Sequence, residues 1–216
     1  MYKAAVRVVS STLISLVIVL AAAPYAHAAA QVTEYNVPSS GSGTSGITYG
    51  PDGNIWFTER QTNKIGKMTP NGTFTEYIIP TPNADPLSIT PGPDGNIWFT
   101  ENGANKIAKI TPSGTITEYP IPSADAFAIS ITAGPDGNVW FVEGNNDMIG
   151  KITPSGTITE YPIPVDLYAA HPGGIASGAD GKIWFTQLNA NKIGSVTTNG
   201  VFAEYDIPTN NSFPWD

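Results

Sequence analysis

A Trp-Phe pair recurs four times in this chain, and its regular spacing limits the fold more than any other feature. The pairs are separated by 42, 42 and 44 residues, beginning at Trp56, Trp98, Trp140 and Trp184. A Glu-Tyr pair has the same period and begins at Glu34, Glu76, Glu118, Glu160 and Glu204. Sequence periods of about 20 to 50 residues indicate stacked or circular repeat folds.

The first copy of the unit predicts four short strands, at residues 47–50, 55–59, 64–69 and 73–79. Pro51-Asp52-Gly53 and Pro70-Asn71-Gly72 separate neighbouring strands with tight turns, in which proline presets φ and glycine accepts a positive φ. Four antiparallel strands in 42 residues are typical of one blade of a β-propeller. We expect the Trp-Phe pairs to pack one blade against the next, and the outermost Thr-Glu-Tyr strands to use glutamate to protect an exposed edge.

Composition and charge agree with this all-β prediction and exclude other classes of protein. The chain has 22 glycines and 19 prolines in 216 residues, which excludes helical solenoids. Its formal net charge of −8 argues against a nucleic-acid partner, because phosphate contacts need many lysines and arginines. The absence of cysteine excludes disulfides, thiolate zinc sites and cysteine nucleophiles.

Residues 1–28 read as a secretory signal peptide. Lys3 and Arg7 precede an apolar run, Leu13–Ala23, and the small-residue sequence Ala26-His27-Ala28 follows. We therefore expect cleavage near Ala28, a secreted or periplasmic protein, and no membrane attachment after cleavage. The alternative is an uncleaved anchor helix, although the uncharged stretch is shorter than the roughly 20 residues of a membrane span. Loss of Lys3 and Arg7 takes the net charge from −8 to −10.

The remaining residues, 29–216, contain four complete units and part of another. We predict blades at about 44–80, 86–122, 128–164 and 172–208. Residues 32–37 match the outer strand of a unit but lack its three inner strands, so we expect an orphan outer strand. Pro214 stands ten residues after Glu204, as Pro86 does after Glu76, so the chain stops in phase at a fifth inner strand. These features favour a fragment of a larger propeller, with two assembled half-rings or a compact four-bladed ring as alternatives.

The unit resembles the streptogramin B lyase (virginiamycin B lyase) family over about 175 residues. The resemblance rests on Gly-Pro-Asp-Gly-Asn-Ile-Trp-Phe-Thr-Glu, Asn-Lys-Ile-Gly and Ile-Thr-Pro-Ser-Gly-Thr-Ile-Thr-Glu-Tyr-Pro-Ile-Pro. It implies a seven-bladed propeller and a carbon-oxygen lyase, which confers antibiotic resistance by opening cyclic depsipeptides at the ester bond in a magnesium-dependent elimination.

The family motif Glu-Pro-His-Gly-Ile implies a histidine base and, two residues earlier, an acidic metal ligand. The glutamate that ends the Trp-Phe-x-Glu strand is implied as a second ligand. The histidine position is occupied in this chain by Ser45, Leu87, Ile129, Gly173 and Trp215. The acidic position is occupied by Gly43, Asp85, Phe127 and His171, and the strand-end position by Glu59, Glu101, Glu143 and Gln187.

Only the second blade offers an acidic pair, Asp85 with Glu101, as candidate metal ligands. The start of an inner strand and the end of its antiparallel neighbour meet at one mouth of the ring, where two carboxylates could hold a hard cation such as Mg²⁺ or Ca²⁺. The alternative is a solvated aspartate beside an unrelated glutamate. His171 is the single histidine after cleavage, and hence the one candidate imidazole base, but it occupies the acidic position of the motif; a loop histidine is the alternative.

Three functions follow from these residues. The first is a secreted streptogramin B lyase-like propeller whose own catalysis is in question, because every family histidine is absent. The second is a non-catalytic propeller that binds a small-molecule or peptide-like ligand, or a protein, at a mouth lined by Glu59, Glu101 and Glu143. A metal-dependent lactonase has little support, because it would need more ligands from several blades. We also expect self-association through open blade edges and faces.

Overall fold

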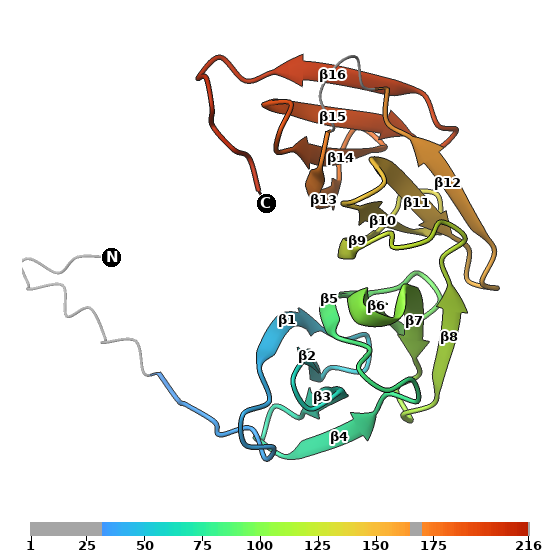
Figure 1. The fold of residues 1–216 in the computed structure, drawn as a ribbon. Coiled ribbons are helices and arrows are strands. Elements are labelled where there is room, and N and C mark those ends of the chain that lie inside the picture. The colour runs from blue at the N-terminus through green and yellow to red at the C-terminus, as the bar shows by residue number, and fades with distance from the viewer. Residues whose placement is uncertain (1–31, 165–169, 216) are drawn as a thin grey trace, which may run out of the picture. The chain divides into compact units, whose positions relative to one another are not determined.

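The protein is all-β. A computed structural model describes residues 32–164 and 170–215, which form four four-stranded antiparallel sheets (Figure 1). Contacts within the chain separate Met1–Glu34 from Tyr35–Asp216, and every strand lies in the second unit. The expected signal peptide, residues 1–28, lies outside the described residues. No helix in the described part of the chain has the length and apolar character needed to cross a membrane.

Each sheet is one blade, and its strands lie in chain order from the inner to the outer edge. Blade 1 contains β1 (Thr44–Tyr49), β2 (Ile55–Glu59), β3 (Lys64–Met68) and β4 (Phe74–Ile78). Blade 2 contains β5 (Pro86–Pro91), β6 (Ile97–Glu101), β7 (Lys106–Ile110) and β8 (Ile116–Pro120), with a 3₁₀ turn at Asn102–Ala104. Blade 3 contains β9 (Ala128–Ala133), β10 (Val139–Glu143), β11 (Met148–Ile152) and β12 (Ile158–Pro162). Blade 4 contains β13 (Pro172–Ser177), β14 (Lys182–Gln187), β15 (Lys192–Thr197) and β16 (Phe202–Asp206).

The turn between the first two strands of each blade also holds the tryptophan that follows it. In blade 2 the indole Nε1 of Trp98 donates to Asp94 Oδ1 at 2.9 Å, and the Asn96 N–H donates to the same oxygen at 3.2 Å. A Cβ atom at Gly92 would lie 2.2 Å from Trp98 Cδ1, so the close approach of the indole requires glycine there. The aspartate of the Gly-Pro-Asp-Gly-Asn motif therefore fixes the buried indole as well as the turn.

The hydrophobic core lies between consecutive blades, as the Trp-Phe pairs predict. Trp56 of blade 1 packs against Phe99 of blade 2, and Trp98 of blade 2 against Phe141 of blade 3. Trp140 of blade 3 packs against Phe185 of blade 4. Each of these three tryptophans is fully buried. A four-bladed arrangement of stacked sheets is thereby confirmed.

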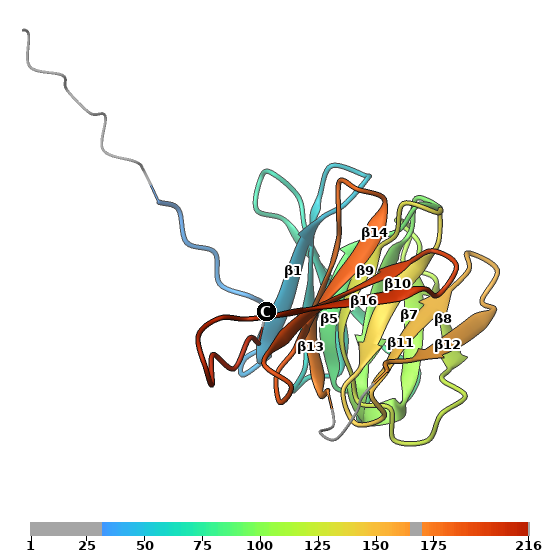
Figure 2. The ribbon, with the colours of Figure 1, turned by 90° about the horizontal axis from the view of Figure 1, so that it is seen from above.

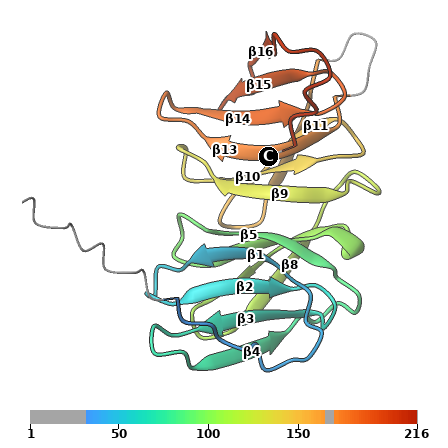
Figure 3. The same cartoon turned by 90° about the vertical axis from the view of Figure 1, so that its left-hand side faces the viewer.

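The inner strands β1, β5, β9 and β13 lie side by side along the centre of the second unit, with the outer strands away from it (Figures 2 and 3). Thr58 Oγ1 donates to Leu87 O at 3.2 Å, which ties blade 1 to the inner strand of blade 2. Because all four inner strands run in one direction, their first residues share one end of the blades. We call this end the mouth.

The described segments before the first blade and after the last blade continue the pattern only in part. Residues 32–37 carry no regular secondary structure, contrary to the orphan outer strand expected there, and none of the four sheets of the described residues includes them. At the other end, Thr186 Oγ1 donates to Trp215 O at 3.1 Å. This bond matches the one between Thr58 and Leu87, so Trp215 takes the place of an inner-strand residue of a next blade.

Candidate functional site at the mouth

The mouth is formed by one backbone position repeated in phase before each inner strand. This position has a positive φ, between 45° and 61°, at Gly43, Asp85, Phe127, His171 and Phe213. Its carbonyl accepts a hydrogen bond from the residue after the second strand, as in Arg60 N–H to Gly43 O at 3.2 Å. Non-glycine residues rarely adopt this conformation, and bulky ones very rarely. The backbone conformation at this position is therefore shared by the blades, whereas the side chain that it carries at the mouth differs from blade to blade.

Asp85 is engaged by an arginine of the neighbouring blade. Arg60 Nε and one of its terminal nitrogens donate to the two carboxylate oxygens of Asp85 at 2.7 and 2.8 Å. These hydrogen bonds to Asp85 raise the pKa of Arg60, so the guanidinium stays charged. The pair borders an open polar cavity of about 410 Å³, which is lined by Gly43, Thr44, Ser45, Arg60, Gln61 and Asp85.

Glu101 lies at the end of β6, where it pairs with Pro86 of β5, and it is fully buried. Neither of its carboxyl oxygens has a hydrogen-bond partner. Burial raises the pKa of Glu101 to about 8, and the negative charge of Glu118 adds to this effect while Lys106 opposes it. At neutral pH, Glu101 is therefore mostly a neutral acid.

These two residues do not fit a magnesium ion as the structure holds them. Hard cations bind accessible oxygen ligands, but both carboxylate oxygens of Asp85 accept hydrogen bonds from Arg60 and the carboxyl of Glu101 is fully buried. Over residues 32–164 and 170–215, no three His, Cys, Asp or Glu side chains come together as a metal site would need. The second blade thus provides an ion pair and a buried acid where the motif implies two ligands.

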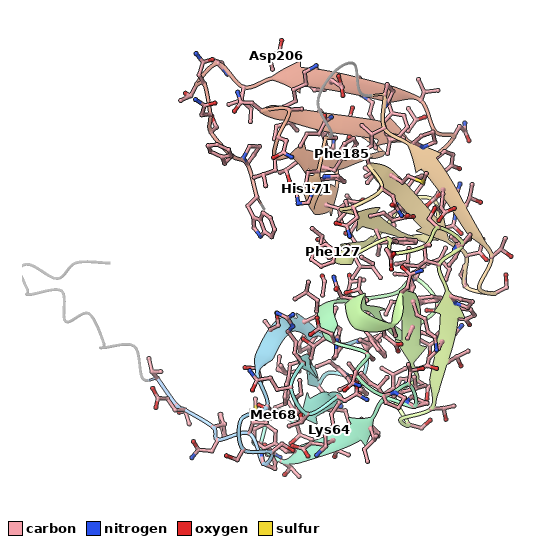
Figure 4. All side chains as sticks on the ribbon, in the orientation of Figure 1. Lys64, Met68, Phe127, His171, Phe185 and Asp206 are labelled. Carbon is pink, nitrogen blue, oxygen red and sulfur yellow. The ribbon has the colours of Figure 1, made fainter. Side chains whose placement is uncertain are left out.

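His171 is half-buried at the mouth, just before β13. Its backbone N–H donates to Asp147 Oδ1 at 2.7 Å, and its carbonyl accepts from Leu188 N–H at 3.3 Å. Figure 4 shows His171 and Phe127 at the inner ends of blades 4 and 3. The contacts that hold His171 are those of a loop residue, and no acidic partner orients its imidazole among the hydrogen bonds of the described residues.

The strand-end glutamates do not line the mouth as the binding hypothesis expects. Glu59, Glu101 and Glu143 all have zero exposure. Sequence reasoning missed this burial because Trp-Phe-x-Glu ends a strand, where a charged residue is normally solvated.

The outer-strand glutamates also have a different role from the one expected. Glu118 accepts hydrogen bonds from the Thr81 N–H at 3.0 Å and the Thr81 hydroxyl at 2.9 Å, and it pairs with Lys106. Glu76 is held in the same way by Ser39. These glutamates therefore anchor the connection between blades, and the pKa of each is lowered, with its lysine and its Ser or Thr partner favouring the charged form. A Ser or Thr 37 residues before Glu76, Glu118 and Glu160 was the available sequence signal.

The comparisons with known proteins decide the family. A profile of the Virginiamycin B lyase family matches residues 24–216. The chain belongs to the virginiamycin B lyase family. Virginiamycin B lyase from Bacillus licheniformis is 50% identical over 42 residues, which are 19% of this chain and 14% of that protein.

Two solved structures of virginiamycin B lyases extend this likeness to nearly all of the described blades. A streptogramin B lyase structure has a TM-score of 0.80 and 44% identity over 85% of this chain and 61% of that chain. A catalytically inactive virginiamycin B lyase from Staphylococcus aureus with quinupristin has a TM-score of 0.83 and 43% identity over 88% of this chain and 64% of that one. The chain thus spans less than two thirds of the length of these virginiamycin B lyases.

Proposed function

We propose that this chain is a secreted, streptogramin B lyase-like propeller that recognises cyclic depsipeptides at the mouth of its inner strands. We further propose that these four blades bind the ligand but do not open its ester. Family membership supports the ligand class. The observation that carries the second statement is that none of the five in-phase positions, Ser45, Leu87, Ile129, Gly173 and Trp215, is a histidine.

An elimination at an ester needs a base beside the carbon that loses its proton and a positive charge near the carbonyl oxygen. The described mouth offers one half-buried imidazole, His171, whose surroundings do not orient it. It also offers one guanidinium, Arg60, which Asp85 already neutralises. The magnesium implied by the resemblance finds no pair of free carboxylates here, so no step of the proposal passes through a metal.

The first experiment incubates the purified chain with quinupristin and Mg²⁺ and separates the products by chromatography with mass detection. Elimination gives a linear product with the mass of the substrate, whereas hydrolysis adds one water. We expect no linear product, together with saturable binding in isothermal titration calorimetry. Ring opening that stops on addition of a chelator would overturn the non-catalytic part, and the absence of binding would overturn the ligand class.

A chimaera separates the lyase scaffold from the alternative, a propeller that only binds. The four blades would be joined to the part of the Staphylococcus aureus lyase that this chain does not cover. Ring opening by the chimaera supports a lyase scaffold. Tight binding without ring opening supports a propeller that only binds. The absence of histidine from the five in-phase positions favours this second outcome.

Secretion and self-association belong to the same proposal. N-terminal sequencing of exported protein is expected to find cleavage near Ala28. Self-association is supported by uncovered apolar faces on both terminal blades: Ile47 and Tyr49 are 71% and 66% exposed on blade 1, and Ile175 and Trp184 line a shallow groove on blade 4. Light scattering after size exclusion is expected to show a dimer or larger species, and a sharp monomer of about 20 kDa would contradict this.

A further inference from the structure

Blade 3 lacks the lysine that neutralises the outer-strand glutamate in the other blades. Lys64 lies 2.7 Å from Glu76, and the corresponding pairs in blades 2 and 4 are 3.1 and 2.9 Å apart. In blade 3 the lysine position is Met148, which pairs with Glu143 across the sheet. Glu160, the outer-strand glutamate of this blade, therefore has no lysine opposite it in the described structure.

Blade 4 shows which kind of side chain can bond to the outer-strand glutamate from the buried position at the end of the second strand. There the strand-end residue is Gln187, whose Nε2 donates to Glu204 Oε1 at 3.0 Å. The register of blade 3 is the same, because Gly150 pairs with Glu160 as Gly194 pairs with Glu204. Glu143 thus faces Glu160 as Gln187 faces Glu204, but an ionised Glu143 has no proton to donate. Both oxygens of Glu143 are buried and without a hydrogen-bond partner.

We propose that Glu143 is held as a neutral carboxylic acid whose O–H donates a hydrogen bond to the carboxylate of Glu160. Loss of this proton at alkaline pH then loosens the connection between blades 2 and 3, residues 121–127, which enters the mouth at Phe127. In blade 3 the hydrogen bond between Glu143 and Glu160 takes the place that the bond between Gln187 and Glu204 has in blade 4. Unlike that bond, it depends on pH.

The groups around Glu143 favour its neutral form on balance. Burial raises the pKa of Glu143 to about 8, and the charge of Glu160 adds to it while Asn146 opposes it. Lys151, on the neighbouring strand, lies 5.1 Å from the Trp140 ring, on the face opposite Glu143 because successive strand residues alternate. Asp147, the other acid of this loop, accepts the His171 N–H.

The connection that would loosen leads directly to the mouth. Glu160 Oε1 accepts the Ser123 N–H at 2.9 Å, and Asn146 Nδ2 donates to Ala124 O at 3.0 Å. The connection ends at Phe127, whose carbonyl accepts from Gly144 N–H, next to Glu143. A second negative charge at Glu143 repels Glu160 in a poorly solvated place, and so strains the contact between Glu160 and Ser123.

The direction of the pH dependence follows from proton binding. The folded protein holds the proton of Glu143 up to about pH 8, whereas the unfolded chain releases it near the ordinary glutamate pKa of 4.5. The folded state binds more protons at Glu143 between these values, so the contribution of this group to stability falls as pH rises from about 4.5 to 8 and is constant outside this window. Glu101 acts in the same direction, so variants are needed to assign the Glu143 contribution.

The test compares thermal unfolding of the intact chain from pH 5.5 to 9.0 in four forms: unchanged, Glu143→Gln, Met148→Lys, and Glu34→Gln as an exposed control. We expect Glu143→Gln to melt close to the unchanged protein at pH 5.5 and about 5 °C above it at pH 9.0. Met148→Lys should lessen the pH dependence only slightly, because Glu101 keeps a pKa of about 8 beside Lys106 in blade 2, and Glu34→Gln should leave it unchanged. A Glu143→Gln difference that is the same at every pH would overturn the proposal.

Two further measurements keep the proposal testable if a variant fails to fold. Hydrogen exchange of residues 121–127, corrected for its intrinsic pH dependence, is expected to accelerate between pH 7 and 9 in the unchanged protein. Infrared spectra of protein with labelled glutamate should show a protonated carboxyl band at pH 7 that Glu143→Gln or Glu143→Ala weakens. Constant exchange, or a band that neither variant changes, would refute it.

Discussion

Trp98→Ala is expected to lower the free energy of unfolding by about 4 kcal/mol, the middle of the range for removing a large buried aromatic side chain. Trp98 is fully buried between blades 2 and 3, and its ring stacks on Tyr119 at a centroid distance of 5.8 Å. Its Nε1 bond to Asp94 would also be lost. Urea denaturation followed by circular dichroism measures the change.

Trp184→Ala is the matched control for this prediction. Trp184 makes the same contacts within its own blade, a 3.0 Å bond to Asp180 and a stack on Tyr205, but it is only half-buried because no blade covers it in the described structure. We expect a loss of about 1–2 kcal/mol. Equal losses for the two variants would show that contacts within a blade, rather than packing between blades, make the tryptophan important.

Asn105→Ala is expected to cost a similar amount, about 4 kcal/mol, through hydrogen bonds and backbone conformation rather than through apolar packing. Asn105 has a φ of 56°, and its side chain donates to Ile121 O and Ser123 O while accepting the Ala126 N–H at 2.8 Å. Losing these three bonds costs about 1 kcal/mol each, and a left-handed alanine adds about 1–2 kcal/mol.

Two variants separate these contributions for Asn105. Asn105→Gly removes the same three hydrogen bonds but accepts the positive φ, so it should be more stable than Asn105→Ala by about 1 kcal/mol. Asn191→Ala removes the corresponding bonds at the last connection, where the partners are exposed, and should cost less than Asn105→Ala. If Asn105→Gly were the less stable variant, the backbone argument would fail.

The fold could be predicted because its signals are local and repeated. Turn sequences and strand alternation lie within a few residues of each other, and four copies in phase fix the strands of every blade. Burial of Trp56, Trp98 and Trp140 also followed, because stacked sheets need large apolar side chains between them. The expected strand at residues 32–37 failed for a physical reason: strand propensity gives no sheet without a neighbouring strand.

The site could be predicted much less well, because its contacts join residues from different units. Asp85 was placed correctly at the mouth, but its pairing with Arg60 depends on how far one blade reaches over the next. Glu101 was assigned by its motif position, and the motif does not reveal that the side chain is buried against Glu118. The spacing between residues of different units, such as the 37 residues from Thr81 to Glu118, indicates which of them are in contact. The 42-residue repeat period alone does not.

The connections between blades bear on how such chains change over evolutionary time. Asn63, Asn105 and Asn191 each bond only to the next connection, and the serine or threonine contacts to the outer glutamates also reach only one unit onward. A duplication or deletion of one whole 42-residue unit therefore leaves every such bond with a partner of the same kind. Propellers of this type can gain or lose blades in single genetic steps, whereas a change of half a unit would orphan a buried amide at each new junction.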